Sequence, residues 1–197
     1  NDENETEKEI TVVIRSFSSM VNDNNLFLSS QCIKRGNIIE AVKELSEISP
    51  NIELSGGSQY DTNQLDRLIE IKENKNINFL IHGYFPPPKE HFILNFADTG
   101  EKTMTFIKET MRFIRALGIN YYSIHAGVKR DFELDGELLI NPGGKYYTLE
   151  GVCKNIEWFN SEYPDKKLAL ENLYPNNMNK ESCFFMHIDE IVEFLKM

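Results

Sequence analysis

The chain has few cysteines, few basic residues and no long apolar runs. Its 3 cysteines are widely spaced and form no CxxC pair, so neither a disulfide framework nor a zinc ribbon is expected. The 21 Lys and Arg face 31 Asp and Glu, and the net charge of −10 argues against a broad nucleic-acid-binding surface. No apolar run approaches the roughly 18 residues of a membrane span, and no basic-then-apolar leader is visible. We therefore expect a cytoplasmic protein for which nucleic acid and membranes are unlikely partners.

The apolar content, by contrast, is sufficient for a folded core. Of the 197 residues 41% are hydrophobic, which supports one globular domain of ordinary size. The opening stretch, NDENETEKE, cannot bury enough apolar surface to offset the entropy of ordering. A strand-like run, ITVVIRSF, comes next, but the polar stretch SSMVNDNN separates it from the next apolar run. We predict that residues 1–24 are disordered or lie outside the main fold, and that residues 25–197 form the domain.

Apolar, β-branched runs typical of strands alternate with helix-like segments along this domain. In order, the runs are LFLSS, NIELS, INFLIH, NYYSIH and KLALEN. Strands that alternate with helices form parallel sheets with right-handed crossovers. The closed form of this architecture, the TIM barrel, needs about eight units in about 250 residues. The sequence thus predicts an α/β fold of TIM-barrel type that is incomplete, with about five of the eight units present and strands six to eight missing.

Capping residues mark where several helices begin. Asn37 with Glu40, and Asp98 with Glu101, have the spacing of capping boxes. Thr148 suits the N-cap of a later helix. These positions predict three helices that come after the first, third and fourth strand-like runs.

Two further helices and a hairpin complete the prediction. One helix is expected from about Asp61, and the last from His187 to Lys196. Residues Asp135 and Gly136 suit the turn of a β-hairpin. The apolar residues of the last helix recur on one face, which is expected to be buried: Ile188, Ile191, Val192 and Leu195.

Polar residues that bind metals or move protons stand at the ends of the predicted strands. Glu53, His82, His125 and Glu171 each close one of these apolar runs. In a β/α barrel the carboxyl ends of the strands converge on one face, where active sites are built. These four residues are therefore candidates for a shared site.

Short motifs on three strands resemble those of the xylose isomerase-like TIM barrels. LIHGYFPPP, SIHAG and ALENL occur in the family's order, and ELSGG fits the end of the second strand. The resemblance covers about Leu26 to Met197. The family includes sugar phosphate isomerases and epimerases, as well as apurinic endonucleases of the endonuclease IV type.

The resemblance implies roles for individual residues. It makes Glu171 a ligand of a divalent metal that in epimerases also exchanges a proton with the substrate, and His125 is taken as a second catalytic residue. His82, Tyr84 and Glu53 become substrate-contacting residues, whereas in the endonuclease branch His82 and His125 are zinc ligands. The family's other ligands, an Asp, a His and a Glu, would lie beyond strand five, so the metal site is expected to be incomplete in this chain.

The chemistry of isomerisation explains these residue types. A divalent metal polarises the sugar oxygens while a carboxylate removes a proton from the neighbouring carbon. Mn, Co, Zn and Mg all suit ligands of this kind. The Pro-rich loop with Tyr84, Phe85 and Phe92 is a candidate wall for a sugar face, although the same rings would equally pack the loop down.

Three functions are therefore considered. The first is metal-assisted proton transfer on a small sugar or sugar phosphate by an isomerase or epimerase, expected of the complete barrel. The second is an apurinic endonuclease-like phosphodiesterase, against which the acidic charge stands. The third is a truncated, non-catalytic barrel that acts as a binding or scaffold module, and its open sheet edge would favour homo-oligomers.

Each candidate residue also has a purely structural interpretation. Glu171 would then belong to a salt bridge, and Glu53 to a pair with a neighbouring Lys or Arg. His82 and His125 would be hydrogen-bonded core residues. Two other histidines, His91 and His187, are predicted to lie on the surface, and the pair of glycines at 56–57 is predicted to be a strand-end turn.

Overall fold

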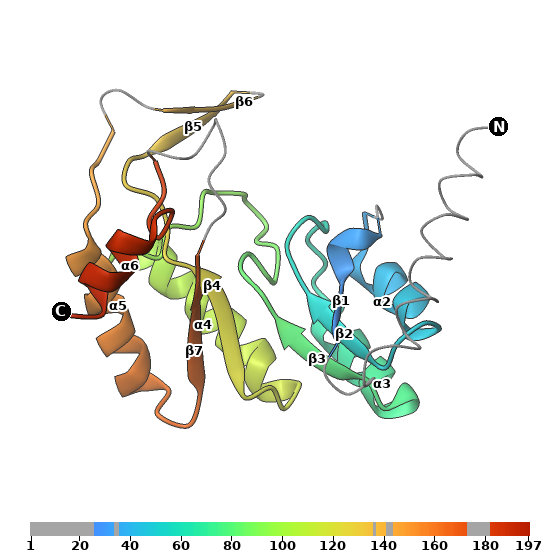
Figure 1. The fold of residues 1–197 in the computed structure, drawn as a ribbon. Helices are drawn as coiled ribbons and strands as arrows, with labels where there is room; N and C mark the ends of the chain where they lie inside the picture. The colour runs from blue at the N-terminus through green and yellow to red at the C-terminus, as the bar shows by residue number, and fades with distance from the viewer. Residues whose placement is uncertain (1–25, 34–35, 136, 141–143, 173–181) are drawn as a thin grey trace.

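The structure is a computed structural model that describes residues 26–33, 36–135, 137–140, 144–172 and 182–197. Strands and helices alternate along the chain, as predicted (Figure 1). In order, the elements are β1 (Leu28–Ser29), the 3-10 helix η1 (Ser30–Cys32), α2 (Ile38–Ser46), β2 (Asn51–Leu54), α3 (Gln64–Lys75), β3 (Asn78–Ile81), α4 (Glu101–Ala116), β4 (Tyr121–His125), β5 (Phe132–Asp135), β6 (Glu137–Ile140), α5 (Leu149–Glu162), β7 (Lys167–Glu171) and α6 (Ile188–Phe194).

The main strands form a parallel sheet in chain order. Strand β2 pairs with β1 and β3, and β4 pairs with β7, in all cases parallel. The two groups are joined where β3 ends, because His82 bridges to Ser123 and the Gly83 amide donates to the Ser123 carbonyl at 2.7 Å. The resulting order β1-β2-β3-β4-β7 is that of a β/α barrel that has not closed, which confirms the predicted incomplete α/β fold.

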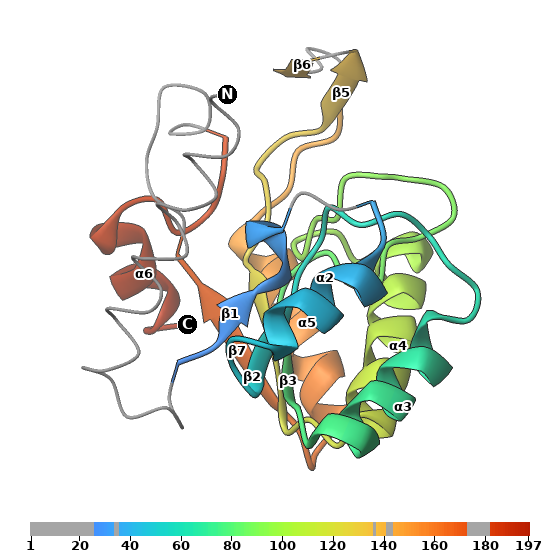
Figure 2. The same cartoon turned by 90° about the vertical axis from the view of Figure 1, so that its right-hand side faces the viewer.

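Helices α2 to α5 cover one face of this sheet (Figure 2). Side chains alternate between the two faces of a strand, so every second residue meets the helices. On β3 these are Phe79 and Ile81, and on β4 they are Tyr122 and Ile124, all of which are buried. The residues between them, such as Ser123, therefore face the other way, as do the polar residues at the strand ends.

The helices bury the apolar stripes that the sequence predicted. In α2 these are Ile38, Ala41, Val42 and Leu45, whereas Ile48 lies past the helix end and is 45% exposed. Helix α4 buries Ile107, Met111 and Ile114, and it ends before Gly118, whose φ of 65° is readily adopted only by glycine.

Helix starts agree less well with the prediction. Asn37 is the N-cap of α2, and its side chain accepts from the Ile39 amide at 2.8 Å. The predicted capping box of Asp98 and Glu101 is wrong, because the N-cap of α4 is Gly100. Asp98 instead accepts from the Gly100 amide at 3.3 Å and from Lys145 Nζ at 2.8 Å, so its carboxylate holds the turn before the helix.

Helices α3 and α5 show smaller differences at their starts. Helix α3 begins at Gln64, after a turn in which the Asp61 carboxylate accepts from the Asn63 amide at 2.9 Å. Thr148 is the N-cap of α5, as predicted, but its hydroxyl makes no capping hydrogen bond. These differences shift helix boundaries by a few residues and leave the order of elements unchanged.

The predicted buried face of the last helix is wrong for most of its residues. Ile188 is 71% exposed, Val192 42% and Leu195 76%. Helix α6 packs through Ile191 and Phe194 instead, and the Phe194 ring lies 4.9 Å from that of Phe185. Within the described part of the chain no strand packs beyond α6, so its remaining apolar face has nothing to bury it.

The predicted hairpin is present, since β5 pairs antiparallel with β6. Its turn residue Gly136, and the whole predicted N-terminal segment 1–24, lie outside the described residues. His91 and His187 are exposed, as expected. None of the described helices has the length and apolarity required to cross a membrane.

Candidate metal centre

Three of the four predicted strand-end residues meet at one point of the sheet. His82 directly follows β3, and His125 and Glu171 end β4 and β7, where they are direct register partners. Each residue offers one ligand atom, and these three atoms all lie within 4.8 Å of one another. The sheet order thus brings together two imidazoles and one carboxylate that are 89 positions apart at their extremes in the sequence.

The contacts within this group leave two imidazole nitrogens without a hydrogen bond. His82 Nε2 lies 3.1 Å from Glu171 Oε2, which fits an ion pair if His82 is protonated, but the direction is not that of a hydrogen bond. His125 Nδ1 has no hydrogen-bond partner either, and both nitrogen atoms are buried. The two rings meet edge to face, with centroids 5.1 Å apart.

Unpaired buried nitrogens are uncommon, because a buried polar atom without a partner is destabilising. A divalent metal ion would satisfy both nitrogens and the nearby carboxylate oxygen together. Two histidines and one glutamate form a donor set found at catalytic zinc sites. The residues present therefore fit a metal ion.

The protonation of His125 also suits a ligand. Burial lowers the pKa of His125 below the ordinary histidine value, and the neighbouring His82 lowers it further. The carboxylate and the backbone oxygen of Glu171 act in the opposite direction and only partly offset these effects. His125 is thus neutral at neutral pH, which is the form that binds metals.

The structural interpretation of Glu171 is met in part, because its Oε2 lies 3.1 Å from His82 Nε2 and the two form an ion pair if His82 is protonated. Among the described residues, no Lys or Arg pairs with Glu171. Its carboxylate instead accepts a hydrogen bond at Oε1 from the hydroxyl of Ser123. The orphaned nitrogens likewise do not fit the interpretation of His82 and His125 as satisfied core residues.

The fourth candidate, Glu53, lies outside the group. Its Oε1 accepts from the Ser55 hydroxyl at 2.7 Å, and Ser55 Oγ is in turn 3.1 Å from Ser29 Oγ. The partner of Glu53 is therefore a serine and not the Lys or Arg that a structural pair would have needed. A substrate contact by Glu53 stays a prediction.

The aromatic residues of the Pro-rich loop pack the loop against α4. The Tyr84 ring stacks on that of Phe106 at 5.1 Å, and its hydroxyl accepts from the Phe92 amide at 2.9 Å. Phe85 is fully buried. Packing thus accounts for these rings, and the role of Tyr84 in substrate binding stays a prediction.

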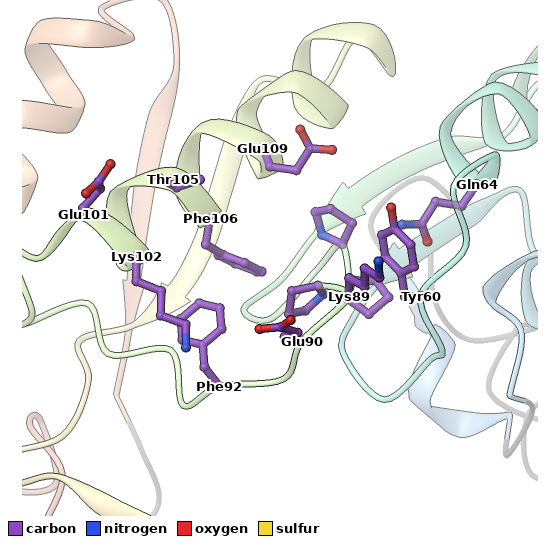
Figure 3. A pocket seen from close by; sticks show the side chains of 13 residues that line it. Tyr60, Gln64, Lys89, Glu90, Phe92, Glu101, Lys102, Thr105, Phe106 and Glu109 are labelled. Atoms are coloured by element: carbon purple, nitrogen blue, oxygen red, sulfur yellow. The ribbon is translucent and has the colours of Figure 1, made fainter.

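A cavity of about 810 Å³ lies between this loop and α4 (Figure 3). Its walls include Pro87, Phe92, Lys102 and Phe106, with Tyr60 opposite α4. None of the three metal-centre residues lines it. The cavity is therefore separate from the candidate metal centre.

Sequence reasoning missed the residues that hold the site in place. The Tyr122 hydroxyl donates to the Gly83 carbonyl at 2.8 Å and so fixes the backbone next to His82. Asn95 bonds both the amide and the carbonyl of Val128, at 2.9 and 3.1 Å, and fixes the chain after His125. No local pattern indicates such contacts, because they join residues more than 30 positions apart.

Ser123 is different, since the sequence does carry a signal for it. It lies two residues before His125, so the two-residue period of a strand places both side chains on the same face. The prediction names only the residues at the strand ends. One step back along the same face would have added Ser123 to the candidates.

The strand order and the polar strand ends define an incomplete β/α barrel with a candidate metal centre at its carboxyl-terminal end. Comparison with solved structures confirms the predicted fold, an incomplete α/β barrel of the TIM-barrel type. One similar structure is titled a D-tagatose 3-epimerase-like protein, with a TM-score of 0.59 and 15% identity over 86% of this chain. Another is an AP endonuclease, family 2, from Brucella melitensis, with a TM-score of 0.57 and 13% identity over 81% of this chain.

The chain spans only part of each of these proteins, 59% of the first and 58% of the second. No family model and no curated protein matches the sequence. At such low identities the likeness establishes the fold, and the chemistry must be argued from the site itself.

Proposed function

We propose that the chain is the metal-binding part of a sugar isomerase or epimerase, and that His82, His125 and Glu171 hold its divalent ion. The observation that carries the proposal is the pair of buried imidazole nitrogens that make no hydrogen bond and lie beside a carboxylate. Two nitrogen donors favour Zn, Co or Mn over Mg, which prefers oxygen ligands.

The metal, when bound, would polarise the oxygens of the substrate and so acidify the neighbouring C–H bond. Glu171 is the proposed base, because its side chain is 43% exposed and within reach of a ligand over the sheet end. His125, neutral and half-buried, would keep its nitrogen available as a ligand. The bridge from His82 to Ser123 joins the end of β3 to β4 and so supports a role for His82 beside these two residues.

A small sugar or sugar phosphate is the proposed substrate. One of the similar structures carries an epimerase-like title, which agrees with this choice. Glu53 and the serine hydroxyls beside it offer hydrogen-bonding groups on the same face of the sheet as His82. Tyr84 is retained as a proposed substrate contact on the resemblance alone.

A phosphodiesterase of the apurinic endonuclease type is the second candidate. It is favoured by the two histidines, since the resemblance makes these zinc ligands in that branch, and one similar structure carries such a title. The net charge of −10 disfavours it, because binding of a phosphate backbone depends largely on basic residues. The non-catalytic scaffold remains a third candidate, supported by the exposed apolar face of α6.

Binding of Co²⁺ to the whole chain tests the proposal. Isothermal titration and the visible spectrum of the bound ion should report one saturable site, lost in His82→Ala, His125→Ala and Glu171→Gln. His91→Ala is the matched control, because that histidine is exposed. Absence of saturable binding, or retention of it in all three variants, would refute the proposed centre.

A second assay separates the candidate reactions. An isomerase or epimerase should exchange a carbon-bound hydrogen of a ketohexose with D₂O, in a way that depends on metal and on Glu171. A nuclease should instead cleave an abasic duplex, at a rate that falls steeply with salt. If neither reaction occurs although metal binds, the scaffold candidate is favoured.

A further inference from the structure

Ser123 is a buried polar residue in the middle of strand β4, and the proposed chemistry does not use it. It is 8% exposed, and its register partners are His82 on one side and Ala169 on the other. Its carbonyl accepts from the Gly83 amide at 2.7 Å, so β3 fixes its backbone. The backbone from which the Ser123 hydroxyl extends is therefore held in place.

The hydroxyl reaches diagonally across to the next strand. It donates to Oε1 of Glu171, two residues beyond its register partner Ala169. Ala169 itself offers no side-chain polar group, so the serine proton is directed to the carboxylate. Diagonal neighbours on adjacent strands are within reach of such side chains.

This hydrogen bond gives the two oxygens of the Glu171 carboxylate different surroundings. With Oε1 engaged by Ser123, the other oxygen, Oε2, lies 3.1 Å from His82 Nε2 and faces the imidazoles. Oε2 is then presented to the position where the ligand atoms converge, and Oε1, which accepts only one hydrogen bond from the described residues, keeps a second lone pair for the proton transfer proposed for Glu171.

We infer that Ser123 is a positioning residue that fixes the Glu171 carboxylate so that it binds the metal through Oε2 alone. The inference rests on the proposed metal centre and adds to it a residue outside the ligand set. Partners that orient metal ligands in this way typically contribute about 10- to 100-fold to metal affinity or activity.

The chain contains a matched control for this contact. Ser55 is also buried and also donates its hydroxyl to a strand-end carboxylate, that of Glu53, at 2.7 Å. Glu53 is not among the converging ligand atoms. If the hydrogen bond from Ser123 to Glu171 contributes only to packing, as the bond from Ser55 to Glu53 is expected to, then Ser123→Ala and Ser55→Ala should have the same effect on Co²⁺ affinity.

The experiment measures the Co²⁺ dissociation constant of the whole chain and of its variants. Ser123→Ala should weaken binding by about 10- to 100-fold. Ser55→Ala should bind within about twofold of the wild type. Metal-free thermal unfolding of both variants serves to show that they are folded.

A second pair of variants keeps the test decisive if Ser123→Ala is poorly folded. Ser123→Thr and Ser123→Val have nearly the same shape, and both β-branched residues suit a strand. Only the threonine carries the hydroxyl. The threonine variant should therefore bind Co²⁺ at least about tenfold more tightly than the valine variant.

The spectrum of bound Co²⁺ supplies a readout that a packing role would not change. A released carboxylate can bind through both oxygens, which raises the coordination number and weakens the visible absorption bands. We expect this loss of intensity in Ser123→Ala and in Ser123→Val, and not in Ser123→Thr.

The possible failures can be told apart. Equal affinity and equal spectra for Ser123→Ala and wild type, while Glu171→Gln loses binding, would overturn the role of Ser123 and leave the metal centre standing. An equal weakening by Ser55→Ala would also overturn it. Absence of Co²⁺ binding in the wild type would overturn both proposals.

Discussion

Two ends of the sheet carry similar groups with different surroundings. On the β1–β2 side of the sheet, the carboxylate of Glu53 accepts a hydrogen bond from the hydroxyl of Ser55. On the β4–β7 side, the carboxylate of Glu171 accepts a hydrogen bond from the hydroxyl of Ser123. Here two imidazoles, each with a buried nitrogen that makes no hydrogen bond, lie beside the carboxylate. A carboxylate at a strand end is therefore not a site by itself. Whether the second carboxylate oxygen lies near other possible metal ligands depends on the residues of the neighbouring strand.

The carboxylates should show the greatest difference between the two ends. Glu171→Gln removes a charged ligand and should weaken Co²⁺ binding by more than about 100-fold, beyond what changes outside the ligand set typically cause. Glu53→Gln is the control and should leave the dissociation constant within about twofold of wild type, since Glu53 lies outside the group of ligand atoms. Titration calorimetry measures both, and equal losses would remove the distinction between the two ends.

The second prediction compares two glycines, Gly57 after strand β2 and Gly127 after strand β4. Gly127 has a φ of 109°, and a Cβ there would lie 2.0 Å from Asn95 Oδ1, whereas Gly57 has a φ of 96° and open space around it. Gly127→Ala should lower the free energy of unfolding by about 3 kcal/mol or more, from strain and collision together. Gly57→Ala adds strain alone, about 1 kcal/mol. Urea unfolding gives both values, and a smaller loss for Gly127→Ala would contradict the geometry of this loop.

The third prediction tests how firmly β3 and β4 are joined beside the centre. Tyr122→Phe removes the hydroxyl that donates to the Gly83 carbonyl and should cost about 1 to 2 kcal/mol of unfolding free energy. The adjacent Tyr121 is 37% exposed, and Tyr121→Phe should change stability by less than about 0.5 kcal/mol. Similar losses in both variants would mean that the Tyr122 hydroxyl does not contribute.

The weakest of these effects concerns pH. Because the pKa of His125 is lower in the folded protein than in the unfolded chain, the unfolded chain binds more protons. Stability of the metal-free protein should therefore fall as the pH drops through the ordinary histidine range, near about 6.5, toward the lowered value. His125→Asn should flatten this dependence in urea unfolding at a series of pH values, whereas His187→Asn, at an exposed position, should not.

Much of the fold was accessible from the sequence. The alternation of β-branched runs with amphipathic segments predicted the parallel strands and their helices, because burial imposes those periods on the chain. The start of α4 was missed because Asp98 caps a turn and pairs with Lys145, which lies 47 residues away. The face of α6 was missed because the pattern shows which residues are apolar and not what will cover them.

Local sequence was enough to specify which residues stand at the strand ends and which share a face, because a strand repeats every two residues. It made Glu53, His82, His125 and Glu171 candidates for one shared site. Only the assembled sheet makes His125 and Glu171 register partners and joins His82 to them through the bridge to Ser123, and it leaves Glu53 outside this group. The physical reason is that strand neighbours and their register are set by packing of the whole sheet against its helices, which no local pattern encodes.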